Sequence, residues 1–248
     1  MSCVQELRKL DPSSLPHVWR VADLAPANAT IATGHSRLDA ALPGSGWPTG
    51  CLIEILQQTP ARHVWQLLLP ALVDIMRRKA GPAVLVGSPL QPFGPSLSAQ
   101  GLPAERLLCV DAEQPRLRLW AAEQALRCAQ VAAVLAWLPA AKNEELRRLH
   151  LAAKQHQRLL FVFRRVQSRD EASPATLRLQ VQGVDCIEIE VVKRRGPPLL
   201  EPLILPATSQ RVRALLQARR ASRTGVPAAN EIAASGRSHV LDRTATVE

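Results

Sequence analysis

The sequence predicts an α/β fold in which a mostly parallel sheet is flanked by helices and finished by antiparallel edge strands. Short, nearly continuous apolar runs alternate with segments of helical period through the first two thirds of the chain. Such runs are typical of parallel strands buried on both faces. After Pro174 the helical segments stop and strand-like runs follow one another. The buried strands are expected at residues 51–56, 83–87, 106–110, 131–137 and 159–163.

Three amphipathic segments between these runs predict helices. Residues 62–79 carry apolar side chains at helical spacing, and residues 115–130 open with a proline, which suits the first turn of a helix. Asn143 is expected to cap a third helix that extends to about residue 157. Glu144 and Glu145 fall in its first turn, where the helix dipole favours acids.

The late strands differ from the early ones in their pattern. Ile187, Ile189 and Val191 alternate with Glu188 and Glu190, so one face of this strand is expected to meet water. The expected late strands are residues 176–181, 184–192 and 199–205.

The chain is expected to divide into three parts. Residues 1–30 indicate an N-terminal helix and linker, and residues 31–205 the core domain. Residues 206–248 indicate a basic tail, partly helical and then disordered because it lacks periodicity. The tail holds seven arginines against three acids and so carries +4 of the net charge of +10.

Composition favours a cytoplasmic protein with no membrane contact. The 248 residues include no uninterrupted apolar stretch of about 18, and the N-terminus lacks the order of a signal peptide. The five cysteines never form a Cys-x-x-Cys pair, which favours free thiols in a reducing compartment.

A nucleotide-binding motif begins in this chain and then stops. Residues 33–39 and 42–50 lead into the apolar run 51–56. A phosphate loop should follow with the pattern Gly-x4-Gly-Lys-Ser/Thr, because its glycines let backbone N–H groups close around phosphates and its lysine reaches their oxygens. Residues 57–63 contain neither glycine nor lysine. The sequence therefore predicts a degenerate nucleotide site at Gln57, Gln58, Thr59, Pro60, Arg62 and His63.

The same residues, with several later stretches in order, resemble the RecA family and, within it, the ImuA family of translesion-synthesis accessory proteins. The resemblance covers roughly residues 17–205. It implies a RecA-like core of the P-loop-NTPase type. The later stretches are residues 120–126, 134–137, 146–153, 173–179 and 193–196.

Resemblance to RecA implies where two further catalytic groups would lie. A carboxylate for the metal-bound water would end the strand at residues 131–137, and a glutamate that orients the attacking water would follow the strand at 83–87. The sequence offers Trp137-Leu138-Pro139 at the first place and Gly87-Ser88-Pro89-Leu90 at the second. Since the Walker A lysine, the Walker B acid and the catalytic glutamate are all missing, we expect no enzyme, no cofactor and no bound metal.

Two basic clusters and the tail are the candidate DNA contacts, because arginine binds phosphate bidentately. In RecA a loop after the fifth core strand contacts single-stranded DNA, and the matching segment here is residues 164–171, which is shorter and lacks glycine. A solvated turn is the alternative for each cluster. Trp47 is a candidate for base stacking, whereas Trp65 is expected in the core. The predicted DNA-binding residues are Arg164, Arg165, Arg169, Lys193, Arg194, Arg195, Arg211, Arg213, Arg219 and Arg220.

The resemblance to ImuA implies a non-catalytic accessory role in SOS-induced mutagenic DNA repair. The implied partners are an inactive Y-family polymerase relative and an error-prone replicative-type polymerase, with RecA and DNA as further candidates. The alternative is a cell-division inhibitor resembling SulA, which binds the tubulin-like division protein. The arginine-rich tail and the basic turn at residues 193–196 favour the repair role.

Overall fold

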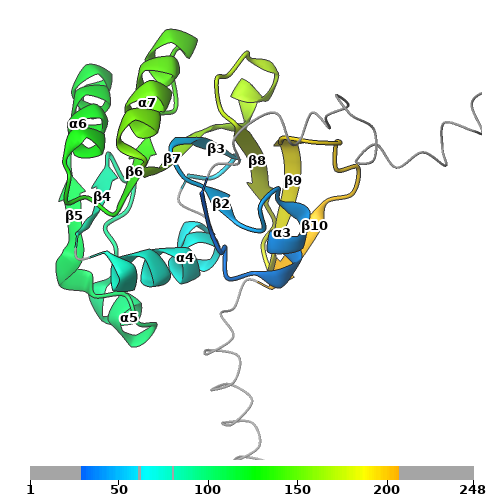
Figure 1. The fold of residues 1–248 in the computed structure, drawn as a ribbon, viewed down its shortest axis with the longest axis horizontal. Helices are drawn as coiled ribbons and strands as arrows, with labels where there is room; N and C mark the ends of the chain where they lie inside the picture. Colours follow the sequence, from blue (N-terminus) through cyan, green and yellow to red (C-terminus); the bar gives the residue numbers. More distant parts are fainter. Residues whose placement is uncertain (1–28, 61–62, 80, 207–248) are drawn as a thin grey trace, which may run out of the picture. The chain divides into compact units, whose positions relative to one another are not determined.

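The computed structural model describes residues 29–60, 63–79 and 81–206. These residues form an eight-stranded sheet with the order β10-β9-β8-β3-β7-β6-β4-β5 (Figure 1). The six strands from β8 to β5 run parallel, and β9 and β10 continue the sheet antiparallel beyond β8. The predicted mostly parallel sheet with antiparallel edge strands is confirmed. Its strands are β3 (Cys51–Gln57), β4 (Ala83–Val86), β5 (Leu107–Val110), β6 (Ala133–Trp137), β7 (Leu159–Arg165), β8 (Leu177–Gln182), β9 (Cys186–Lys193) and β10 (Leu203–Pro206).

The three predicted helices are α4 (Val64–Arg78), α6 (Pro115–Arg127) and α7 (Asn143–His156). The capping prediction is wrong by one residue, because α7 begins at Asn143 and Lys142 is the capping position. The Glu145 carboxylate accepts a hydrogen bond of 2.7 Å from the Lys142 backbone N–H, so the acid in the first turn satisfies a donor that the helix leaves open.

Several short elements join these longer ones. Two small strands, β1 (Thr30–Ile31) and β2 (Trp47–Pro48), pair antiparallel in a separate sheet. The remaining short elements are α3 (Ser36–Ala41), α5 (Gly94–Ala99) and the 3-10 turns η2 (Ala104–Arg106) and η3 (Val166–Asp170).

The sheet has a hydrophobic core on each face because its central strands alternate between two sets of apolar side chains. Ile53, Ile55 and Phe161 point to the face that α3, α4 and α5 cover. Leu52 and Val162 point to the opposite face, which α6 and α7 cover (Figure 1). No helix among the described residues is long and apolar enough to cross a membrane.

Candidate functional site

The six parallel strands all end at one edge of the sheet, and the residues predicted to form a degenerate nucleotide site lie at this carboxyl edge. Ligands of open α/β sheets bind outside the carboxyl ends of the strands. The turn that follows β3 therefore lies at the edge where ligands of such sheets usually bind.

The turn after β3 is short and is closed by a histidine. Gln57 is buried at the strand end, while Gln58, Thr59 and Pro60 are exposed. His63 has a left-handed backbone (φ 59°) and lies directly before α4. Its Nε2–H donates a hydrogen bond of 3.0 Å to the backbone carbonyl of Gly183, in the turn between β8 and β9. The imidazole thus ties the start of α4 to the neighbouring hairpin. Arg62, the sixth predicted residue of this site, lies outside the described residues.

The ends of β4 and β6 are occupied by packing contacts. Gly87, after β4, has a φ of +62° that favours glycine, and its N–H donates to Val110 across the sheet edge. Trp137, at the end of β6, stacks on Phe163 with ring centroids 4.4 Å apart. At the two strand ends where resemblance to RecA implies catalytic acids, the structure therefore has the Trp137–Phe163 stack and the Gly87–Val110 backbone hydrogen bond.

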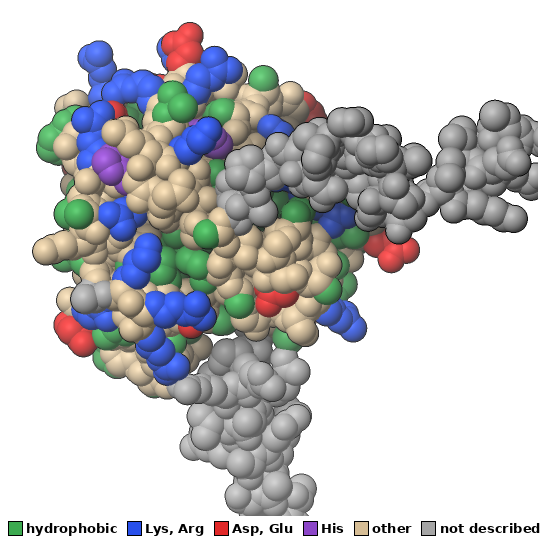
Figure 2. Space-filling model, viewed as in Figure 1, with side chains coloured by type: hydrophobic (Ala, Val, Ile, Leu, Met, Phe, Trp, Pro, Cys, Tyr) green, Lys and Arg blue, Asp and Glu red, His purple; other side chains and the backbone are tan. Residues whose placement is uncertain are grey.

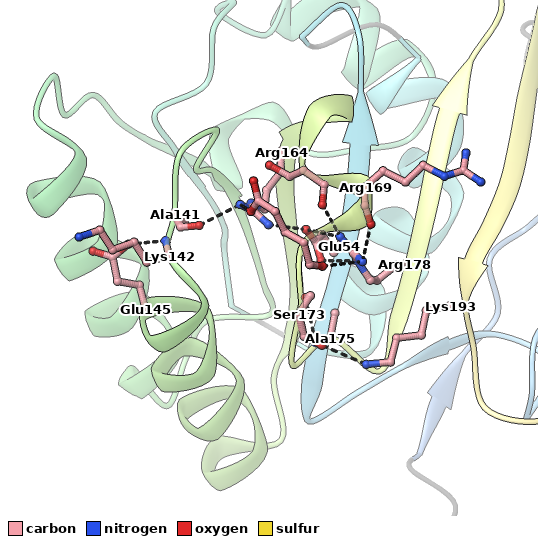
Figure 3. A network of polar contacts seen from close by, with 12 residues as sticks. Glu54, Ala141, Lys142, Glu145, Arg164, Arg169, Ser173, Ala175, Arg178 and Lys193 are labelled. Atoms are coloured by element: carbon pink, nitrogen blue, oxygen red, sulfur yellow. Dashed lines mark hydrogen bonds and ion pairs between the residues drawn. The ribbon is translucent and has the colours of Figure 1, made fainter.

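A buried ion network fills the neighbouring part of the sheet (Figure 3). Glu54 is fully buried in the middle of β3. Its carboxylate receives hydrogen bonds from the guanidinium groups of Arg164, at 3.0 Å, and Arg178, at 2.8 Å. Arg164 also pairs with the exposed Glu171 at 2.7 Å, and this hydrogen bond holds the pKa of the Glu171 carboxyl below its usual range.

The same arginines fix the segment around η3 against the sheet. Arg178 donates to the backbone carbonyls of Ser168, at 2.8 Å, Arg169, at 2.9 Å, and Glu171, at 3.1 Å. Arg164 donates to the Ala141 carbonyl at 2.9 Å. A buried charge is tolerated only when it is paired. The Glu54 carboxylate is paired with two guanidinium groups, while the buried Nε of Arg164 has no hydrogen-bond partner among the described residues.

The prediction that Arg164 contacts DNA is wrong. Its side chain is 2% exposed and is held by Glu54, Glu171 and the Ala141 carbonyl. Sequence reasoning also missed Glu54. The signal was present, because a single acid within the otherwise apolar run of residues 51–56 requires a buried cationic partner.

The other two arginines of the first cluster differ from Arg164. Arg165 is exposed at the end of β7. Arg169 is half-exposed and forms a bidentate ion pair with Glu190 on β9. This hydrogen bond raises the pKa of Arg169 and lowers that of Glu190.

The second basic cluster lies at the opposite edge of the sheet. Since β9 runs antiparallel to β8, its last residue, Lys193, pairs with Arg178 near the amino end of β8. Lys193 is exposed and donates to the Ser173 carbonyl at 3.0 Å (Figure 3). Arg194 donates to the carbonyls of Pro197, at 2.8 Å, and Ala41. The fold therefore does not bring the two predicted clusters together.

The remaining predicted contacts have different outcomes. Trp47 is fully buried and packs edge-on against Phe161, with centroids 5.2 Å apart, so the base-stacking prediction is wrong. Trp65 packs against the core as predicted. Arg211, Arg213, Arg219 and Arg220 lie outside the described residues.

Within residues 29–60, 63–79 and 81–206, no group of three His, Cys, Asp or Glu side chains is placed to hold a metal ion. No protein-family model matches the chain, and no curated protein matches its sequence.

Proposed function

We propose that this chain is a non-catalytic accessory protein of SOS-induced translesion DNA synthesis, with a RecA-like core whose nucleotide site is degenerate. It would act in the cytoplasm through protein and DNA contacts in DNA damage-induced mutagenesis. Its partners would be an inactive Y-family polymerase relative and an error-prone replicative-type polymerase, with RecA as a further candidate.

The observation that carries the proposal is the closure of the turn after β3. A phosphate cradle needs successive backbone N–H groups that face an open space. Here the His63 side chain spans the start of α4 and donates to the Gly183 carbonyl. Gln58, Thr59 and Pro60 meet solvent, and none is a glycine or lysine. A chain with such a sheet, but with a side-chain contact instead of a phosphate cradle after β3, is better suited to bind other macromolecules than to hydrolyse ATP.

The charge of the chain supports a role beside nucleic acid. Its net charge is +10. On the face drawn in Figure 2, Lys and Arg side chains gather over α6 and α7, with fewer acidic side chains among them. Contacts of this kind bind phosphates without reading sequence and weaken as salt rises.

The translesion role is tested in cells treated with a DNA-damaging agent. Affinity-tagged chain should co-purify with the Y-family polymerase relative, and a strain that lacks the chain should lose most of its damage-induced mutations. Co-purification with the tubulin-like division protein, together with an unchanged mutation frequency, would favour division inhibition and contradict the proposal.

DNA contact is tested separately with purified protein. Lys193→Ala should reduce the slope of log affinity against log salt by about one unit if Lys193 contacts one phosphate. Arg77→Ala, which removes an exposed cation at the end of α4, is the matched control. Equal slopes for the native chain and the Lys193 variant would exclude this contact.

A further inference from the structure

A cavity of about 570 Å³ lies at the amino edge of the sheet, away from the turn after β3. One wall is the end of α3 and the segment after it, including Ala40, Ala41 and Pro43. The other wall is the turn that follows β9, which contributes Arg194 and Arg195. Leu177, the first residue of β8, forms part of the base. We call this cavity the amino-edge groove.

Arg194 fixes the width of the groove. Its guanidinium donates to the Pro197 carbonyl within its own turn and to the Ala41 carbonyl in the opposite wall. Both walls are thus joined by one side chain, so the groove is defined before any ligand arrives. A preformed concave site of 300–1,000 Å³, mainly apolar with few polar groups, is typical of ligand binding.

The lining determines the chemistry of the occupant. Two arginines line the groove, and none of its other lining residues is acidic. Alanine, leucine and proline side chains supply most of the remaining surface. An occupant must therefore offer apolar groups to the walls and negative charge to the arginines. A nucleic acid strand fits poorly, because its sugars and phosphates would lie against apolar walls.

An exposed leucine follows the turn that forms one wall of the groove. Leu200, three residues after Pro197, is 90% exposed, although leucines are usually buried. A ligand that also covers Leu200 must be longer than the cavity, which favours a protein segment over a small anionic molecule.

We propose that the amino-edge groove binds an extended segment of a partner protein in which apolar side chains alternate with or adjoin carboxylates. Apolar side chains of the segment occupy the space above Leu177, and carboxylates face the Arg194 and Arg195 wall. None of these contacts depends on the translesion role proposed above.

The test uses the full chain and a random dodecapeptide display library. The library is selected on the native chain and counter-selected on two variants, Ala40→Trp, which narrows the groove, and Arg195→Glu, which reverses the charge of one wall. Thermal melting confirms that each variant is folded, and Arg77→Glu is the matched control on a distant exposed arginine. The best peptide is then synthesised with a fluorescein label and titrated by anisotropy.

We expect enriched peptides to combine leucine or other apolar residues with Asp or Glu. Each groove variant should weaken binding of the labelled peptide at least about tenfold, and Arg77→Glu by less than about twofold. The proposal is overturned by peptides that bind the Ala40→Trp chain as tightly as the native chain, or by an absence of enrichment. It is also overturned if the selected peptides match residues 1–28 of the chain, or if only oleate, and no peptide, binds in a groove-dependent way.

Discussion

Glu54 shows how one residue can determine the surroundings of a site. It lies beside Arg178 in the register of β3 and β8, and Arg164 approaches it from β7. The Arg178 guanidinium also holds the backbone carbonyls of Ser168, Arg169 and Glu171. The predicted DNA-binding segment, residues 164–171, is therefore partly buried: Arg164 lies in the protein interior, and only Arg165 and Arg169 reach solvent.

Removal of the Glu54 charge should be costly. Glu54→Gln leaves the buried Arg178 guanidinium without a counter-charge and leaves Arg164 paired only with the exposed Glu171. Breaking a buried pair in this way typically costs about 3–5 kcal/mol. We expect a loss of this size in the free energy of unfolding measured with urea. Glu201→Gln, at an exposed position, should change it by less than about 0.5 kcal/mol. A loss below about 1 kcal/mol for Glu54→Gln would contradict the structural role of the network.

His150 should make stability depend on pH. Its Nδ1 accepts a 3.3 Å hydrogen bond from the Leu52 N–H, which requires the neutral ring. Burial, followed by the charges of Lys154 and Lys193, lowers the pKa of His150. The unfolded chain, with a histidine pKa of about 6.5, therefore takes up the proton more readily. The free energy of unfolding should fall as the pH drops through about 6.5 and level off below the folded pKa.

The variant His150→Gln tests this pH dependence, since glutamine can accept the Leu52 bond without titrating. Between about pH 7 and about pH 5, the unfolding free energy of this variant should decrease less than that of the native chain. Arg147→Gln, at an exposed position of α7, should show the same dependence of unfolding free energy on pH as the native chain. An unchanged slope in His150→Gln would show that this histidine is not responsible.

At the scale of elements, a glycine allows the segment that precedes α3 to pack closely against α4. Gly34 has a φ of +81°, and a Cβ added there would lie 2.3 Å from Cβ of Pro70 in the middle of α4. The lead-in to β3 therefore packs directly on the helix that follows β3. In this structure its glycines serve close packing and tight turns.

Gly34→Ala should destabilise the fold more than a glycine substitution in open space. Gly196→Ala is the matched control, because Gly196 has a similar φ of +93° and nothing within 4 Å of an added Cβ. A left-handed backbone costs an alanine about 1–2 kcal/mol, and the overlap with Pro70 should add about 1–3 kcal/mol. Urea unfolding of the two variants measures the difference, and equal losses would exclude the steric contact.

The long elements were predictable because their sequence periods are simple. The run in β3, apolar except for Glu54 and Gln57, predicts a buried strand, and the helical spacing of apolar residues in α4 predicts a helix. The short elements α3, β1, β2 and η3 carry too few residues for a period. Contacts made far along the chain stabilise them, such as the bond from Arg178 to the carbonyl of Ser168 in η3.

The candidate site was predictable only in part. Residues 57–63 show in sequence that they lack the glycines and lysine of a phosphate loop. The hydrogen bond from His63 to Gly183 was not predictable, because it joins residues 120 positions apart. Arg164 and Arg165 are adjacent in sequence, yet one is buried and the other exposed. Alternation along β7 does not distinguish them, because both faces of this strand are buried up to Arg164, and Arg165 is exposed at the end of the strand.

For the whole molecule, we propose that the sheet supports binding to partners and not nucleotide hydrolysis. At the carboxyl edge His63 contacts Gly183, and one basic cluster lies near this edge. The other basic cluster lies at the amino edge beside the amino-edge groove. Binding surfaces at both edges suit an accessory protein that contacts more than one partner.

Magnesium-dependent ATP hydrolysis by the purified chain, with and without single-stranded DNA, tests this claim most directly. We predict no turnover above background in either condition, with an active RecA protein assayed alongside as the positive control. Turnover that requires magnesium and disappears in a Thr59→Ala variant would contradict the account, because it would locate a working nucleotide site in the turn after β3.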